Sequence, residues 1–308
     1  MRIVLLISQT TLNEFVNEFG NLVLDDPIII DDFIAVIPII DENSDFENRE
    51  YITAEEAGDA LIIKDTGNIN EVLITNKHSQ TVLIVAGTIV KSSGQETQDR
   101  VIIETQLIEP HTTVKVPCRC VHASQPISTG SGFRYHERVP HRMMKMMLCS
   151  DHLEVSQMGV WNEIRGAVTE LKSRNLLNNN YNSDRLTDVL ENLKAKLSKK
   201  FENIESRKNQ VGVIVVKGDK ILGIELVDHP ATYKSIHYKI LKGYIDALID
   251  KTKKSLNIDK ALKEKLSEIR HSRENKVKNK VIKEGSKTKC EILFDKKKSN
   301  KRIMYRCI

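Results

Sequence analysis

The segment VGVIVVKGDKILGIELVDHP, residues 211–230, decides the fold class. Two apolar runs rich in β-branched residues, 211–216 and 221–227, flank the dipeptide of Gly218 and Asp219, which is typical of a tight hairpin turn. Pro230 follows, and proline is tolerated at the start of a helix because the first helical amides have no acceptor within the helix. The segment therefore predicts an antiparallel hairpin followed by a helix.

Upstream of this hairpin, short apolar runs are bounded by Asp, Asn, Gly or Pro, which is typical of antiparallel strands. The clearest runs are 33–40, 81–86, 101–108 and 113–121. Thr53 and Glu56 have the spacing of a capping box, so one short helix is expected among the strands.

Helical spacing of apolar residues begins later, in 160–177 and again in 186–204. Residues 124–137 are rich in Ser and Gly and are predicted to form a long loop, of the kind that is often functional. Strands, then helices, then a late hairpin and helix favour an α+β fold with an antiparallel, strand-rich N-terminal half and helices packed against it.

The charge of the chain changes sign near residue 250. Of the 308 residues, 251–308 hold 20 Lys and Arg against 7 Asp and Glu, a net of +13, whereas 1–250 carry −8. We therefore expect one α+β domain over 1–250 and a basic, Lys-rich extension over 251–308 that is partly helical or mobile. Within the extension, 290–294 and 303–307 are predicted to pair as a terminal hairpin.

Composition excludes several classes of protein. With 40% hydrophobic and 29% charged residues, the chain is neither disordered throughout nor collagenous. No apolar run approaches the roughly 20 residues of a membrane helix, and the first residues lack the features of a signal peptide. Five cysteines, an odd number in a long chain, are unlike a disulfide framework. We expect a cytoplasmic protein with reduced thiols and no membrane partner, and the Lys-, Ile- and Asn-rich usage favours a prokaryotic origin.

Cys118, Cys120 and His122 alternate along one predicted strand, which places all three side chains on one face. Thiolates and imidazole are zinc ligands, so zinc is one cofactor that the pattern permits, although the cofactor is otherwise unknown. Residues 111–152 hold 8 of the 14 His and Cys of the chain. Alternatively, Cys120 is a nucleophile with His122 as its base, or the thiols pack as small apolar residues.

Arginines and amides near the predicted loop offer a second kind of chemistry. The residues that would bind an anion are Gln98, Arg100, Arg134, Arg138 and Arg142. Guanidinium groups bind phosphate through two parallel hydrogen bonds, and the Ser- and Gly-rich stretch 128–132 offers backbone amides. The alternative is a solvated basic loop without a ligand.

An ordered set of segments carries a resemblance to a known family. The segments are YITAEEA (51–57), Gly87, QDR (98–100), VPCRCV (116–121), Gln157 with Val160 and Trp161, and GIELVDHPATY (223–233). In this order the chain resembles, over roughly residues 30–250, the ARG and rhodanese-phosphatase-superfamily-associated protein domain family, which is uncharacterised. The resemblance implies, by association, a setting near ADP-ribose or phosphate chemistry.

From these observations we expect a pocket that binds or processes a phosphate-bearing small molecule, such as a nucleotide or an ADP-ribose derivative. Whether the protein is an enzyme is left open. The candidate catalytic residues are Gln98, Cys120 and His122, and the candidate ligand-binding residues are Gly87, Arg100, Arg134, Arg138, Arg142 and Gln157.

Two other functions are compatible with the sequence. The basic extension would bind nucleic acid through its phosphates, with Lys296, Lys297, Lys298, Lys301 and Arg302 as the candidate contacts. A partner-binding module without catalysis would use the methionines of 143–158. The oligomeric state is left open.

Overall fold

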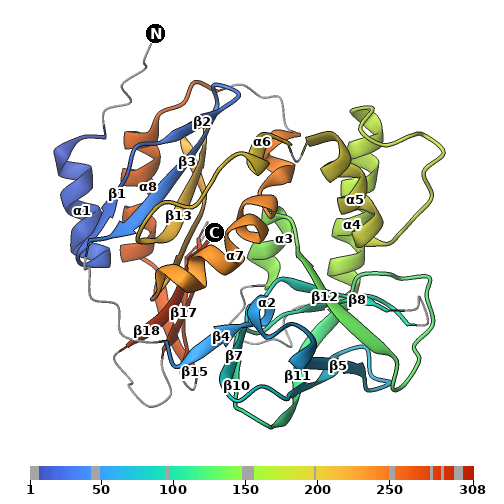
Figure 1. The fold of residues 1–308 in the computed structure, drawn as a ribbon. Coiled ribbons are helices and arrows are strands. Elements are labelled where there is room, and N and C mark those ends of the chain that lie inside the picture. The colour runs from blue at the N-terminus through green and yellow to red at the C-terminus, as the bar shows by residue number, and fades with distance from the viewer. Residues whose placement is uncertain are drawn as a thin grey trace. The chain divides into compact units, whose positions relative to one another are not determined.

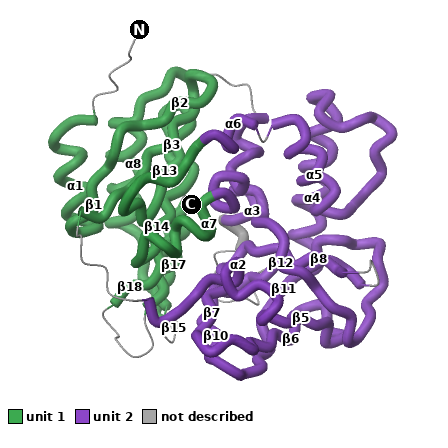
Figure 2. Tube along the Cα trace, in the orientation of Figure 1, with its two compact units in different colours: residues 1–48, 204–237, 250–308 green, residues 49–203, 238–249 purple. Residues whose placement is uncertain are grey.

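The structure, a computed structural model, describes residues 7–42, 49–93, 97–147, 156–197, 199–249, 254–277, 280–285, 288–294 and 301–308. The chain has the predicted α+β fold (Figure 1). It divides into two compact units (Figure 2): unit 1 comprises 1–48, 204–237 and 250–308, and unit 2 comprises 49–203 and 238–249. These boundaries differ from the expected one at residue 250, because unit 1 draws on both ends of the chain.

Unit 1 is built on an antiparallel sheet of nine strands. Its strands are β1 (Leu22–Leu24), β2 (Ile28–Ile30), β3 (Ile34–Asp41), β13 (Gln210–Lys217), β14 (Lys220–Val227), β15 (Arg273–Val277), β16 (Lys280–Glu284), β17 (Lys289–Phe294) and β18 (Arg302–Cys307). The order is β1-β3-β13-β14-β18-β17-β16-β15, and β2 pairs with β3. Nearly every residue of β13 is buried, which explains its unbroken apolar sequence, since strands covered on both faces do not alternate.

The predicted hairpins of this sheet are confirmed. Strands β13 and β14 pair around Gly218, whose φ of +58° suits glycine. Helix α7 (Pro230–Lys242) begins at Pro230 and is followed by the 3₁₀ turn η3 (Ile245–Leu248). The terminal hairpin of β17 and β18 also forms. Because β18 pairs with β14 as well, the described part of 251–308 continues the sheet and is not a separate appendage.

Two helices cover one face of the sheet, α1 (Gln9–Phe19) and α8 (Ile258–Arg270). Their apolar stripes, including Phe15, Leu262 and Leu266, join a core with Ile214 and Ile224 of the central strands. Helix α8 lies in the extension that was expected to be partly helical, and its buried residues recur with amphipathic spacing. Burial of this stripe explains why a segment with so many lysines is ordered.

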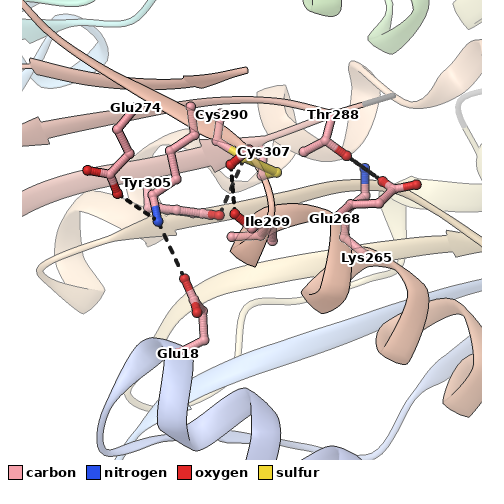
Figure 3. The surroundings of a disulfide bond; sticks show 11 residues. Glu18, Lys265, Glu268, Ile269, Glu274, Thr288, Cys290, Tyr305 and Cys307 are labelled. Carbon is pink, nitrogen blue, oxygen red and sulfur yellow. Dashed lines mark hydrogen bonds and ion pairs between the residues drawn. A yellow bond between two sulfur atoms is a disulfide. The ribbon is translucent and has the colours of Figure 1, made fainter. Parts of the chain in front are cut away.

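Cys290 and Cys307 form a disulfide between β17 and β18 (Figure 3). The two residues lie directly opposite one another in the strand register and are fully buried. The hydroxyl of Tyr305 donates a hydrogen bond to Cys290 Sγ at 3.5 Å. The expectation of reduced thiols is therefore wrong for this pair, because a separation of 17 residues in sequence does not reveal strand register.

Unit 2 contains a closed barrel and a small sheet. The barrel strands are β5 (Leu61–Asp65), β6 (Glu71–Asn76), β8 (Thr88–Ser92), β9 (Arg100–Ile102), β11 (Thr113–Cys120) and β12 (Gly132–Arg138), which close in the order β11-β6-β5-β12-β8-β9. Strands β4 (Tyr51–Thr53), β7 (Thr81–Ile84) and β10 (Gln106–Ile108) form the small sheet, in which β4 and β7 are parallel. Side chains such as Ile63, Ile74 and Val116 fill the apolar core.

One strand prediction and one loop prediction need correction. The run 101–108 is not one strand but β9 and β10, which belong to different sheets. Between them the amide of Ile103 donates to the carbonyl of Pro117, and Thr105 Oγ1 accepts from the amide of Ala86, so the chain leaves the barrel there. The predicted loop 124–137 is a loop only in its first part, because its second part forms β12.

The helices of unit 2 are α2 (Ala54–Ala57), α3 (His141–Met147), α4 (Gln157–Ser173), α5 (Leu186–Leu197) and α6 (Lys199–Glu202), with the 3₁₀ turn η1 (Gly58–Ala60). The capping box of Thr53 and Glu56 is present at α2. Helix α4 confirms the first predicted helix, and α5 with α6 replaces the second. Among the described residues, no helix is both long enough and apolar enough to cross a membrane.

Candidate functional site at one end of the barrel

A buried ion pair lies inside the barrel. Arg100 of β9 places Nη2 3.1 Å from Asp65 Oδ2, and neither side chain is exposed to solvent. Arg100 Nη1 donates to the carbonyl of Gln98 at 2.6 Å, and Thr97 Oγ1 donates to Asp65. A buried ion pair has a large desolvation cost that only good geometry and further hydrogen bonds offset. Arg100 is therefore committed to partners within the barrel.

A second buried ion pair lies beside the first. Arg185, which precedes α5, donates through Nε and Nη2 to the two carboxylate oxygens of Asp99 at 2.7 and 2.9 Å. The amide of Ser92 and the hydroxyl of Thr187 also donate to Asp99. Burial opposes ionisation of Asp99, but these hydrogen bonds lower its pKa below the usual value of 3.8. Asp99 is thus a carboxylate at neutral pH.

Sequence reasoning missed the roles of Asp99 and Arg185. Asp99 lies within the motif QDR that carries the family resemblance, and that was the available signal. Arg185 follows an Asn-rich linker and has no distinctive neighbours in sequence. Only the fold brings the two together.

Gln98 anchors the loop that leads to β12. Its Nε2 donates to the carbonyl of Gln125. Next to it, Thr97 Oγ1 accepts a hydrogen bond from the amide of Ser128 at 3.2 Å. The side chains that precede β9 therefore hold residues 125–128 against the end of the barrel.

The two thiols of β11 are buried, as their alternation predicts. Cys118 is packed in the barrel core, and burial raises the pKa of its thiol to about 12. Burial also raises the pKa of Cys120, whose Sγ donates to the carbonyl of His122 at 3.1 Å. Both are therefore neutral thiols at neutral pH, whereas a cysteine nucleophile reacts as the thiolate. A nucleophilic role for Cys120 stays a prediction.

His122 lies just beyond β11 at the rim of the barrel. Its Nε2 is 3.4 Å from Ser124 Oγ and 3.7 Å from Asp184 Oδ1, and Ser124 Oγ donates to Asp184 at 2.9 Å. Burial and the charge of Arg185 lower the pKa of His122 below 6.5, so the ring is neutral at pH 7. Ser124 and Asp184 both approach Nε2 of His122, whereas in a hydrolytic triad the serine and the aspartate contact different nitrogens of the histidine ring. The cluster thus suits hydrogen bonding to a ligand better than activation of Ser124.

Zinc ligation finds no support within the described part of the chain, where no group of three or more His, Cys, Asp and Glu is arranged to hold a metal ion. Cys118 points into the apolar core, away from a shared site with His122. Cys149 and His152, two of the eight His and Cys of 111–152, lie outside the described residues.

Gln157, the first residue of α4, extends the ladder of β11 with its side chain. Its Nε2 donates to the carbonyl of Cys120 at 2.7 Å, and its Oε1 accepts from the amide of Cys120 at 2.8 Å. The amide group thus replaces a neighbouring strand at the end of the barrel. Gln157 holds the backbone of Cys120 in place.

Five of the predicted residues therefore converge at this end of the barrel. They are Gln98, Arg100, Cys120, His122 and Gln157. We call these five residues, together with Asp65, Asp99, Ser124, Asp184 and Arg185, the barrel-end site.

The other predicted ligand-binding residues make different contacts. Gly87 has a φ of +84°, and a Cβ built there would meet Met144 at 2.5 Å, so its place is explained by packing. Arg142 donates through Nε to Asp246 at 3.1 Å and through Nη1 to Glu170 at 2.7 Å. On β12, Arg134 is exposed and Arg138 is buried.

The candidate nucleic-acid contacts are only partly described. Lys296, Lys297 and Lys298 lie outside the described residues. Lys301 Nζ is 3.8 Å from Asp228, and the guanidinium of Arg302 lies 5.9 Å from the rings of Phe19 and Tyr305 within unit 1. Nucleic-acid binding by these residues stays a prediction.

The methionines of 143–158 differ in their exposure to solvent. Met143 and Met144 are buried, whereas Met158 is 54% exposed. The side chains of Met146 and Met147 lie outside the description. The prediction of a partner surface therefore depends on Met158 within the described residues.

The fold and site define a mixed α+β protein in which a six-stranded barrel carries buried ion pairs and a polar rim. The chain belongs to the ARG and Rhodanese-Phosphatase-superfamily-associated Protein domain family, which it matches over residues 21–302. The match continues past residue 250, where the resemblance was expected to stop, in accord with the place of β15 to β18 in the sheet. Comparison with curated proteins and with solved structures gave no match.

Proposed function

We propose that unit 2 binds a phosphate-bearing small molecule, such as a nucleotide or an ADP-ribose derivative, at the rim of the barrel-end site. The observation that carries the proposal is the polar cluster of His122, Ser124 and Asp184, placed directly next to Arg185 and its buried partner Asp99. Perturbed titratable groups that combine burial with specific charged partners are concentrated at functional sites.

The chemistry of the rim fits the sugar of such a ligand. Asp184 is a hydrogen-bond acceptor with a 36% exposed side chain, and Ser124 is exposed and both donates and accepts. Vicinal ribose hydroxyls need acceptors of this kind. The neutral ring of His122 adds a further donor or acceptor without attracting or repelling charge.

Rigidity of the rim supports binding. The loop after β11 is held by Gln98 and Thr97, and the start of α5 is held by the ion pair of Arg185 with Asp99. Groups that are fixed before binding lose little conformational entropy when the ligand arrives. The two ion pairs therefore act as positioning groups for the rim, which is where a ligand would contact the protein.

Isothermal titration calorimetry with ADP-ribose, ADP, AMP and ribose 5-phosphate tests the proposal on the full chain. We expect one of these ligands to bind, and Asp184→Asn to weaken its binding at least tenfold. Lys115→Gln is the matched control, because Lys115 lies on the same strand as Cys120 but is 65% exposed and contacts Glu71. Binding by none of the ligands, or equal binding by wild type and Asp184→Asn, would reject the proposal.

Thermal unfolding provides a second readout that does not depend on heat of binding. A ligand present at 100 times its Kd stabilises the folded state by about 2.7 kcal/mol. Analysis of the same mixtures for products separates a binding protein from an enzyme, since only turnover changes the ligand.

We also propose that the protein works in the cytoplasm. The composition supports this, whereas the disulfide of Cys290 with Cys307 is of a type uncommon there. Alkylation of thiols in cells lysed directly into denaturant tests the location, because both cysteines are buried in the folded protein. Alkylated Cys290 and Cys307 would support the cytoplasm, and a fully retained disulfide would count against it.

A further inference from the structure

A group of lysines lies at a second place in unit 2, over the strand β12. Lys194 comes from α5, Lys239 and Lys242 from α7, and Lys91 from β8. These four residues are called the lysine cluster. The carboxylates that accompany them are Glu55, Glu137 and Glu191.

The contacts of the cluster are defined by three ion pairs and one aromatic ring. Lys239 Nζ lies 3.2 Å from Glu55 Oε1 and 3.7 Å from the centroid of the Tyr135 ring. Lys194 pairs with Glu137, and Lys91 Nζ lies 2.5 Å from Glu191 Oε1. Lys242 has no carboxylate partner among the described residues, yet its charge acts on Lys194.

The lysines are close enough to repel one another while partly shielded from water. The side chains of Lys194 and Lys239 are only 18% and 23% exposed. Burial lowers the pKa of both ammonium groups, and each is lowered further by a neighbouring lysine, Lys242 for Lys194 and Lys194 for Lys239. Like charges held together in this way are costly unless an anion offsets them.

The balance of charge leaves a positive excess. Arg134 of β12 is exposed and lies opposite Lys91 in the strand register. The four lysines and Arg134 outnumber the three carboxylates, so positive charge is in excess. A phosphate monoester carries about −1.5 to −2 charges at pH 7 and three acceptor oxygens, so it would offset this excess.

His136 adds a separate indication of a ligand. It lies on β12 between Tyr135 and Glu137, the residues that contact Lys239 and Lys194, and the charges of the cluster act on its ring. Its Nε2 is buried and has no hydrogen-bond partner in the described part of the chain. Buried polar atoms of proteins are nearly always paired, and an unpaired one calls for a missing partner. An anion among the lysines would accept from this nitrogen when it carries the proton.

We propose that the lysine cluster binds a phosphate group, either as inorganic phosphate or as the terminal phosphate of a small molecule. Ammonium groups act as point charges with several donors and need no fixed approach angle, which suits a tetrahedral anion. The site is distinct from the barrel-end site, and the proposal stands whether or not the rim binds a sugar.

The contrasting interpretation is a charged surface without a ligand, on which each ion pair contributes little. That interpretation requires chloride and phosphate to act alike at equal ionic strength, because salt then only screens the charges. The two interpretations therefore differ in a measurable way.

The experiment is isothermal titration calorimetry of the full chain with inorganic phosphate. The ionic strength is kept constant with chloride as the balancing anion. Parallel titrations with ribose 5-phosphate and with ribose distinguish a phosphate monoester from the sugar alone. We expect saturable binding of phosphate and of ribose 5-phosphate and, in Asp184→Asn, whose sugar-binding rim is altered, no binding of ribose.

Lys242→Gln is the informative variant, because removal of the Lys242 ammonium group leaves no described carboxylate without a partner. We expect at least a tenfold loss of phosphate affinity in Lys242→Gln and a larger loss in Lys194→Gln/Lys242→Gln. Lys115→Gln serves as the charge control, and Asp184→Asn reports on the barrel-end site, so both should retain phosphate binding. Absence of saturable phosphate binding, or unchanged affinity in a folded Lys242→Gln protein, overturns the proposal.

Discussion

Arg185 contacts both carboxylate oxygens of Asp99, at 2.7 and 2.9 Å, although 86 positions separate the two residues in sequence. Asp99 lies between β8 and β9, and Arg185 lies just before α5. The pair therefore fastens the start of α5 to the end of the barrel. Because His122 also bridges to Arg185 through the backbone, the pair sets the position of the rim.

The first prediction concerns this ion pair. Asp99→Asn removes the charge that the buried guanidinium of Arg185 requires, and breaking a buried pair in this way costs about 3–5 kcal/mol of unfolding free energy. Urea denaturation followed by circular dichroism measures the loss. Glu71→Gln, which breaks the exposed pair with Lys115, is the control and should change stability by at most about 1 kcal/mol. Equal effects of the two variants would contradict the assigned role of Asp99.

The second prediction separates packing from ligand binding at Gly87. An alanine there must adopt a φ of +84° and meets Met144, so Gly87→Ala should destabilise the protein. The left-handed backbone contributes about 1–2 kcal/mol, and overpacking adds about 1–3 kcal/mol.

A double-mutant cycle checks the origin of that effect. In a Met144→Ala background, Gly87→Ala should cost less, because the methionine side chain no longer occupies the space of the new Cβ. Additive effects of the two substitutions would mean that the contact with Met144 is unimportant.

The third prediction concerns the disulfide. Its loss should lower the stability of unit 1 by about 3 kcal/mol, as expected for a cross-link that closes a loop of this length. Thermal unfolding of Cys307→Ser against wild type measures the effect. Cys120→Ser, a change of a buried cysteine outside the disulfide, controls for the removal of a buried sulfur. A reducing agent should then lower the Tm of wild type but not that of Cys307→Ser.

The fourth prediction concerns pH. Burial lowers the pKa of His122, His136 and His237 below the model-peptide value of 6.5. A lowered pKa means that the unfolded chain takes up protons first, so the stability from neutral histidines is complete above pH 6.5. That stability is lost as pH falls from 6.5 through the folded pKa values, by up to about 1.4 kcal/mol per pH unit for each histidine.

Urea denaturation at pH 7.5 and pH 5.5 measures this loss. His237→Gln should reduce it, because burial lowers the pKa of His237 despite the opposing hydrogen bond to the carbonyl of Ile204. Asp99 and Asp246, whose pKa values lie below 3.8, should contribute only under more acidic conditions. Stability that does not change between pH 7.5 and 5.5 would refute the prediction.

Local patterns were sufficient for several elements of secondary structure. The turn at Gly218, the start of α7 at Pro230 and the capping box of Thr53 with Glu56 depend on residues within a few positions of each other. The errors had a non-local origin. Strands β9 and β10 form one apolar run in sequence, and they separate because the chain passes from the barrel to the small sheet.

Predictions about the candidate site also held where they depended on neighbouring residues and failed where they depended on distant ones. Alternation predicted that Cys118, Cys120 and His122 share one strand face; the two cysteines are buried in β11, whereas His122 lies beyond the end of that strand at the rim. Alternation did not predict that Arg100 would form a buried ion pair with Asp65, because the two residues are 35 positions apart. Ser124 and Asp184, 60 positions apart, meet at the rim only through the path of the chain between α4 and α5.

The sequence by itself determined the fold class, the family and the change in charge near residue 250, since each is carried by composition or by spacing over short distances. Only the tertiary structure decided what that change means. The described part of the +13 segment joins the sheet because the apolar stripe of α8 packs into the core of unit 1 and β18 pairs with β14. Burial and strand pairing act between residues far apart in sequence, so they also decided which charged residues form buried ion pairs.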